Sequence, residues 1–314
     1  MQPIFKSWSE EQTSGWGTRP LAFATALHEL PLFSDDVLSD LIDRYPKQNY
    51  ALVHMGARGE KRQYWREGDI GALSGREVMS RIAGGRMWLN LRNVSDVDGR
   101  YKALLDQLFA EISEHIAGFD IIQRSMGILI SSPMAQVYYH ADLPGQALAQ
   151  IRGSKRIYIY PPREPFLTQT GLENIALHGL EVDLAYDPSF DQHATIFDLT
   201  PGQLLHWPLN GPHRVENHDC LNISITVEYL TPEIRRHQIV TSANAVLRQK
   251  LGLTPGSSAT SGASYWAKAV LQAGARRSGW LGRQQARKRT ISFQLDPSAA
   301  GGMRDIAAEH APTS

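Results

Sequence analysis

Three residues of this chain combine types and spacing that suit a metal ion. His140 and Asp142 stand two positions apart, and on a strand such residues point to the same face while Ala141 faces away. His213 follows a predicted strand and a Pro/Gly turn, and it is the third candidate ligand. Two imidazoles and one carboxylate on one face leave coordination positions open for a chelating molecule and oxygen, as in the facial triad of non-haem Fe(II) sites.

A second motif follows the first histidine at a defined distance. The segment 150–156 reads Gln-Ile-Arg-Gly-Ser-Lys-Arg and leads to Pro161-Pro162, and its lysine, Lys155, stands fifteen positions after His140. His213 stands eleven positions after Gly202. These motifs resemble the cupin-like branch of the JmjC-type Fe(II)/2-oxoglutarate oxygenases, which includes the asparaginyl hydroxylase that inhibits hypoxia-inducible factor. The resemblance covers about residues 120 to 231.

The resemblance implies roles for individual residues. His140, Asp142 and His213 bind Fe(II) and are the catalytic centre. Lys155 pairs with the distal carboxylate of 2-oxoglutarate, and O2 is the other cosubstrate. Further cosubstrate-binding residues predicted from the resemblance are Gln146 and Tyr158, with Tyr139 and Ser131 as other candidates for a second hydrogen bond to the carboxylate.

Three positions depart from the family pattern. Val137 stands where close relatives have a hydroxyl, Gln146 where they often have asparagine, and Glu228 where another asparagine is frequent. A carboxylate at position 228 either adds a negative charge beside the cosubstrate or faces away from the site. These departures affect the predicted cosubstrate contacts and leave the iron triad unchanged.

The implied function is that of a dioxygenase, an oxidoreductase that hydroxylates a protein side chain or a small molecule by hydrogen abstraction and rebound. The main alternative is a non-catalytic or regulatory cupin-like binding module whose basic tail contacts nucleic acid. A third reading is a cupin enzyme, such as an isomerase or a direct dioxygenase, that uses its metal without 2-oxoglutarate. The presence of Lys155 at the family spacing argues against both alternatives.

The remaining histidines compete poorly as ligands. His206 lies within a predicted strand, at a position usually aromatic in the family, so we expect it in a wall of the pocket or directly behind the residues that line it. His218 lies in a polar turn and is predicted to be solvated. Among the aromatic residues near the triad, Tyr138, Tyr139 and Trp207, a single side chain is more often packed than functional.

The elements that position these residues change character along the chain. A polar cap at Ser34 predicts a helix through about Arg44, a strand fits residues 50–55, and apolar residues at helical spacing predict a helix over 101–116. Between about 121 and 230 the pattern becomes one of short strands separated by turns, which is typical of a sandwich or barrel. The predicted strands are 127–131, 136–140, 156–160, 194–197, 203–207 and 221–229.

The predicted fold is therefore mainly β with flanking helices: a double-stranded β-helix, or jelly-roll cupin/JmjC barrel, with a helical C-terminal extension. We expect residues 1–119 to form a mixed region that packs on the barrel, 120–232 to form the barrel, and 233–314 to form the extension. Helices are predicted around 243–251 and 265–275 in that extension, and its end is predicted to be frayed.

Composition and charge restrict the partners. The 314 residues contain 32 Lys+Arg and 32 Asp+Glu, an ordinary globular composition, and the single cysteine, Cys220, excludes an internal disulfide. Residues 234–295 carry eleven basic and no acidic side chains, which favours a solvated helical face or a contact with the acidic remainder over nucleic-acid binding. The compact cluster 287–289 is short for nucleic acid. We expect a cytoplasmic protein with no membrane partner, and a homodimer is a further expectation.

Overall fold

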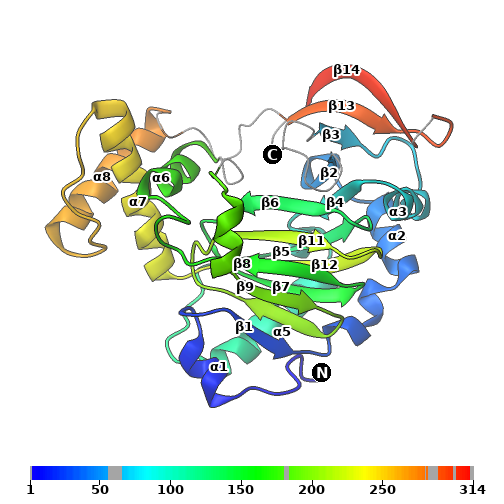
Figure 1. Ribbon diagram of the computed structural model, residues 1–314, viewed down its shortest axis with the longest axis horizontal. Helices are drawn as coiled ribbons and strands as arrows, with labels where there is room; N and C mark the ends of the chain where they lie inside the picture. Colours follow the sequence, from blue (N-terminus) through cyan, green and yellow to red (C-terminus); the bar gives the residue numbers. More distant parts are fainter. Residues whose placement is uncertain are drawn as a thin grey trace.

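Eight strands form a barrel of two facing sheets in the computed structural model, which describes residues 2–55, 66–179, 184–279, 281, 289–299 and 302–311 (Figure 1). One side has the order β10-β7-β12-β5 and the other the order β6-β11-β8-β9. Apart from β8 and β9, which are neighbours in one sheet, successive strands alternate between the two antiparallel sheets, as in a double-stranded β-helix. The strands are β5 (Gln123–Ser131), β6 (Gln136–His140), β7 (Gly145–Arg152), β8 (Lys155–Ile159), β9 (Thr195–Leu199), β10 (Gln203–His206), β11 (His213–Asn217) and β12 (Asn222–Leu230).

The register of the strands brings the predicted site residues opposite one another. In the pairing of β6 with β11, His140 is the direct partner of His213. In the pairing of β12 with β7, Glu228 is the partner of Gln146. Strand β8, which begins at Lys155, pairs with the other edge of β11. The lysine therefore lies on the strand next to a metal strand, as predicted.

The N-terminal region extends the larger sheet beyond the barrel. Strand β1 (Leu21–Ala24) pairs with β10, and on the other side β4 (Met87–Leu91), β2 (Tyr50–His54) and β3 (Arg66–Asp69) continue from β5. The helices α1 (Glu10–Gly15), α2 (Asp35–Asp43), α3 (Gly75–Gly84), α4 (Val94–Val97) and α5 (Gly99–His115) belong to this region. Apolar side chains of α2, α3, α5 and the large sheet form one buried core.

Local sequence signals explain the helices that were predicted here. The Ser34 hydroxyl accepts a hydrogen bond from the amide of Val37, so it caps α2 as expected. The apolar residues at three- and four-residue spacing on α5, which include Tyr101 and Phe109, are buried. The predictions of helices at 34–44 and 101–116 and of the strand from Tyr50 are confirmed.

Three helices gather at one end of the barrel (Figure 1). They are α6 (Gln169–His178), α7 (Pro232–Leu251) and α8 (Gly262–Arg277), and α7 packs against both of the others. Leu177, Val246 and Ala275 contribute to a small shared core between them. The two helices predicted in the C-terminal region are confirmed, although α7 begins at Pro232, eleven residues earlier than predicted.

The C-terminal region is not helical throughout, and the prediction of a frayed end is wrong. Strand β13 (Arg289–Leu295) forms an antiparallel hairpin with β14 (Met303–Ala311) and pairs in parallel with β3. Ile291, Phe293 and Leu295 alternate with polar residues and are buried, and the Phe293 ring lies over Gly68, where a side chain would clash with it. The hairpin therefore joins the sheet of the N-terminal region, while the proposed division into three regions stays a prediction.

Three remaining expectations concern partners. No helix among the described residues combines the length and the apolar character needed to span a bilayer. Residues 287 and 288 of the basic cluster 287–289 lie outside the described residues. The expectation of nucleic-acid binding through that cluster therefore stays untested, as does the expectation of a homodimer.

Candidate metal and cosubstrate site

The three predicted ligands meet at one point of the barrel. Strand β6 ends at His140, Asp142 follows two residues later, and His213 opens β11 directly opposite. The Asp142 Oδ2 lies 3.8 Å from Nε2 of His140 and 3.4 Å from Nε2 of His213. One potential ligand atom from each residue lies within 4.8 Å of the other two. The separation suits three donors around one ion.

Hydrogen bonds to backbone carbonyls fix which ring nitrogen of each histidine faces the common point. Nδ1 of His140 lies 2.7 Å from the Tyr138 carbonyl oxygen, and Nδ1 of His213 lies 3.0 Å from that of Gly211. A carbonyl only accepts, so both Nδ1 atoms carry the proton and both Nε2 atoms present a lone pair. Two lone pairs and a carboxylate oxygen therefore converge, and a metal cation fits this donor set.

Burial shapes the protonation of the triad. The loss of hydration raises the pKa of Asp142, which the neighbouring His140 partly opposes. Burial, together with the charge of His140, lowers the pKa of His213 well below its usual value. A neutral imidazole is the form that binds a metal, so burial favours the protonation state of His213 that can act as a ligand.

Neighbouring side chains hold the ligands in place. The Asn210 amide donates a hydrogen bond of 2.6 Å to the backbone carbonyl of Asp142, and Asn210 adopts a positive φ of 58° to do so. The Trp207 ring packs on the His213 ring with 4.7 Å between centroids. Sequence reasoning identified the turn at 210–212 but missed this positioning role of Asn210.

A cavity of about 180 Å³ extends from the triad into the barrel. His140, Asp142 and His213 line it together with the predicted residues Lys155 and Gln146. Its other walls come from both sheets and are largely apolar, among them Val137, Leu129, Leu148, Ile157, Val215 and Trp207. Five of the six predicted site residues therefore share one cavity.

Lys155 is a buried lysine that has no partner among the described residues. Its side chain is 3% exposed, and burial lowers its pKa to about 7. Among the described residues, no carboxylate or other hydrogen-bond acceptor contacts its ammonium group. A buried charge of this kind is costly unless an opposite charge accompanies it, so the residue suits an anion inside the cavity.

Ser131 can supply a second contact to such an anion. It lines the same cavity, and its Oγ accepts a hydrogen bond of 2.8 Å from the amide of Asn217, the strand partner of Lys155. Within the described part of the chain no acceptor takes the Ser131 hydroxyl proton. Of the three candidates considered for the second hydrogen bond, Ser131 is the one that faces the cavity.

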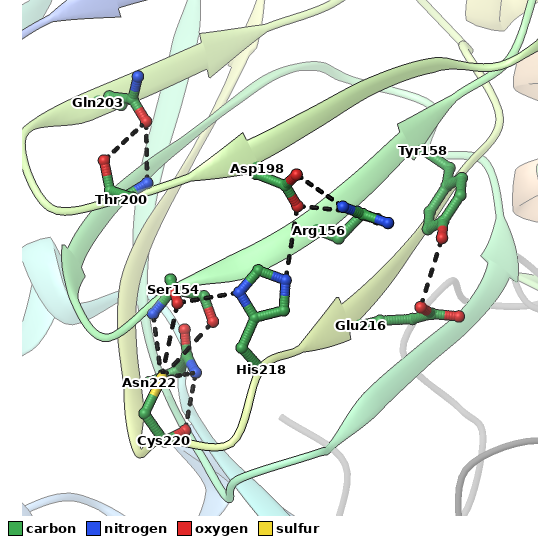
Figure 2. A network of polar contacts seen from close by, with 10 residues as sticks. All are labelled: Ser154, Arg156, Tyr158, Asp198, Thr200, Gln203, Glu216, His218, Cys220 and Asn222. Atoms are coloured by element: carbon green, nitrogen blue, oxygen red, sulfur yellow. Dashed lines mark hydrogen bonds and ion pairs between the residues drawn. The ribbon is translucent and has the colours of Figure 1, made fainter.

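The prediction that Tyr158 binds the cosubstrate is wrong, because its side chain does not line the cavity. Side chains alternate along β8, so Lys155 faces inward and Tyr158, three positions later, faces outward. Its hydroxyl donates a hydrogen bond of 3.4 Å to Glu216, as Figure 2 shows. The guanidinium carbon of Arg214 lies over its ring, 3.4 Å from the ring centroid. Tyr139 also lies outside the cavity, because its hydroxyl donates to the carbonyl of Phe166 over 2.7 Å.

The three departures from the family pattern all face the cavity. Val137, Gln146 and Glu228 line it. Burial and the nearby Asp142 raise the pKa of Glu228 to about 7, and the Ser125 hydroxyl donates to its carboxylate over 3.4 Å. Of the two placements open to a carboxylate at position 228, the structure shows the one that faces the site.

The competing histidines lie elsewhere. His206 is buried on the other side of β10, where it stacks on Trp16 at 3.8 Å and its Nδ1–H donates to the Gln146 carbonyl. It does not line the cavity, and its hydrogen bond to the backbone of the lining residue Gln146 places it behind the wall, which is the second of the two positions expected for it. His218 lies at the surface beside Ser154 and Asp198 (Figure 2).

The fold and the triad together place the chain among double-stranded β-helix proteins with a two-histidine, one-carboxylate site. No protein-family model and no curated protein matches the sequence. Among solved structures, the X-ray structure of Escherichia coli YcfD superposes with a TM-score of 0.51 and 17% identity over 90% of this chain and 70% of that chain. YcfD is a ribosomal oxygenase of the JmjC type.

A second structure of the same E. coli protein, in complex with cobalt and 2-oxoglutarate, gives a TM-score of 0.50 and 17% identity over 95% of this chain and 76% of that chain. At this identity the similarity concerns the fold. It confirms the predicted double-stranded β-helix with flanking helices, and with it the resemblance to the JmjC-type fold.

Proposed function

We propose that this protein is an Fe(II)- and 2-oxoglutarate-dependent oxygenase that hydroxylates a protein side chain or a small molecule. The observation that carries the proposal is the cavity in which His140, Asp142 and His213 converge and Lys155 has no partner among the described residues. In this proposal the three converging side chains bind one metal ion and Lys155 binds one carboxylate. The complex of YcfD with cobalt and 2-oxoglutarate supports the same pair of ligands.

Each residue has a defined part in this proposal. His140, Asp142 and His213 hold the metal from one side and leave the other side open to 2-oxoglutarate and O2. Lys155 and Ser131 bind the distal carboxylate and so orient the cosubstrate. When bound, the metal supplies the activation of O2, which side chains cannot provide.

The walls contribute by excluding water. Val137, Leu148, Ile157 and Val215 surround the space between Lys155 and the triad. An apolar lining strengthens the attraction between the ammonium and the carboxylate, because little solvent screens it. It also protects an oxidising reaction from side reactions with water.

Anaerobic titration of 2-oxoglutarate into the Fe(II)-loaded protein tests the proposal without knowledge of the substrate. Chelation by the keto acid produces a metal-to-ligand charge-transfer band. We expect the band in the wild type and in His218→Ala, a histidine variant on the outer face. We expect His140→Ala to lose it, and Lys155→Met to need about 100-fold more 2-oxoglutarate, because the variant loses a buried ion pair.

Two outcomes would contradict the proposal. If Fe(II) binds and no band forms at any 2-oxoglutarate concentration, the cosubstrate assignment fails. If His140→Ala retains the band, the metal lies elsewhere.

A further inference from the structure

A second cavity of about 480 Å³ adjoins the metal cavity. Glu228 lines both cavities, and Leu143 and Pro144, which follow the ligand Asp142 directly, line the second. Its remaining walls come from α6, α7, α8 and the start of β5, at the end of the barrel where these helices gather (Figure 1). The two cavities therefore share Glu228 as a wall.

The second cavity is rich in arginine. Arg124, Arg235 and Arg276 line it, from β5, α7 and α8 respectively. Arg124 is already paired with Asp106 at 2.7 Å. The guanidinium groups of Arg235 and Arg276 have no carboxylate or other acceptor among the described residues. Glu228 is the one acidic side chain among the described lining residues, and it lies at the junction with the metal cavity.

A buried amide in the same wall also lacks a partner. Gln272 stands one helical turn before Arg276 on α8 and is 7% exposed. Its side-chain amide makes no hydrogen bond within the described part of the chain. Because Gln272 lines the cavity, its amide is available to a polar ligand bound there.

The wall is also fixed relative to the metal ligands. The amide of Gln238, on α7, donates a hydrogen bond of 3.0 Å to the carbonyl oxygen of Leu143. Because Leu143 is the residue after Asp142, this bond ties the helix that carries Arg235 to the loop of a metal ligand. The arginines therefore have a defined place relative to the reacting centre.

We infer that the second cavity is the substrate site and that the substrate carries an anionic group, a carboxylate or a phosphate, which Arg235 and Arg276 bind. The inference rests on the proposed oxygenase function, since it requires a C–H bond of the same molecule to reach the triad past Glu228. Guanidinium groups bind carboxylate and phosphate oxygens in pairs of parallel hydrogen bonds. The volume matches a small molecule or one segment of a peptide.

Binding of two simple anions tests the inference. Inorganic phosphate and tricarballylate, a tricarboxylate without a keto acid, are titrated into the full-length protein by calorimetry at low salt. The double variant Arg235→Gln/Arg276→Gln removes both unpaired cations. Arg236→Gln/Arg277→Gln is the matched control, because it makes the same charge change on the same helices at arginines that do not line the cavity.

We expect the wild type and the control to bind at least one anion with equal affinity, and the Arg235/Arg276 variant to bind it about tenfold more weakly. The anion that binds more tightly identifies the group as a carboxylate or a phosphate. Equal affinity in the two double variants, or no binding to the wild type, would overturn the inference. The charge-transfer band, measured on the same samples, tests the oxygenase function separately: its absence with anion binding retained refutes that function and the substrate role, and leaves an anion site.

Discussion

The two faces of the four-stranded sheet β6-β11-β8-β9 differ in whether their charged side chains are paired. On the outer face, Arg214 lies between Asp191 and Glu216, and Arg156 pairs with Asp198 through two hydrogen bonds of 2.7 and 2.8 Å (Figure 2 shows the second pair). Every one of these charges has a partner within the chain. The outer face is therefore complete without a ligand.

On the inner face the charges lack such partners. Lys155 is buried with no described acceptor, and two histidine lone pairs converge with the Asp142 carboxylate. Unpaired buried charges lower stability, so a fold that retains them gains something other than stability. The difference between the faces shows that the chain can pair its charges when their role is structural, and that the inner face depends on ligands.

The largest expected difference between the faces concerns metal binding. His213→Ala removes one of three donors, and we expect the affinity for Fe(II) to fall at least 100-fold, since even the partners of metal ligands contribute about 10- to 100-fold. His218→Ala removes an imidazole from the outer face and should leave the affinity unchanged. Anaerobic Fe(II) titration measures both. Equal losses in the two variants would mean that the inner face is not the metal site.

Sequence reasoning located the inner face well because its motifs combine residue type with fixed spacing. His140, Asp142, His213 and Lys155 were predicted and lie in one cavity. The spacing also explains why the prediction for Tyr158 fails. Residues three positions apart on a strand face opposite sides, so Lys155 and Tyr158 cannot both face the cavity. Which of the two side chains faces inward depends on the strand register, and the sequence alone does not give that register.

Other features depend on contacts between distant segments. Ser131 faces the cavity because β5 pairs with β12, and its acceptor role depends on Asn217 from a third strand. The hairpin β13–β14 gains its place from a parallel pairing with β3, more than 200 residues earlier in the chain. Local patterns contain no information about such partners, so the segment that forms β14 was predicted to be frayed.

On the outer face, the largest effect should be on stability. Arg214→Met removes a side chain that is 12% exposed and leaves Asp191 and Glu216 without their cation. The pKa of Asp191 is lowered chiefly by hydrogen bonds from Arg214 and the tyrosines around it, although burial acts against them. We expect a loss of about 2 to 3 kcal/mol in the free energy of unfolding, measured by urea denaturation. The affinity for Fe(II) at the inner face should not change. A loss of that affinity would show that the two faces are energetically coupled.

On the inner face, stability without ligands should rise with pH. Burial lowers the pKa of Lys155 from 10.5 to about 7, so above pH 7 the unfolded chain binds a proton that the folded chain does not. The free energy of unfolding then increases between pH 7.5 and 9.5, by about 2 kcal/mol more in the wild type than in Lys155→Met. Urea denaturation of metal-free protein across this range measures the difference. Parallel pH profiles for the two proteins would contradict a buried, unpartnered lysine.

The smallest effect is expected for the exposed pair on the outer face. Arg156 lowers the pKa of Asp198 through side-chain hydrogen bonds, yet both side chains are more than 40% exposed, so solvent screens the pair. Asp198→Asn should change the melting temperature by no more than about 2 °C, because exposed ion pairs contribute little. Differential scanning calorimetry at pH 7 is the measurement, with Arg214→Met as the reference for a half-buried pair on the same face. If Asp198→Asn destabilised the protein as much as Arg214→Met, burial would not determine how much each ion pair of the outer face stabilises the protein. The argument that burial makes Lys155 costly would then lose its physical basis.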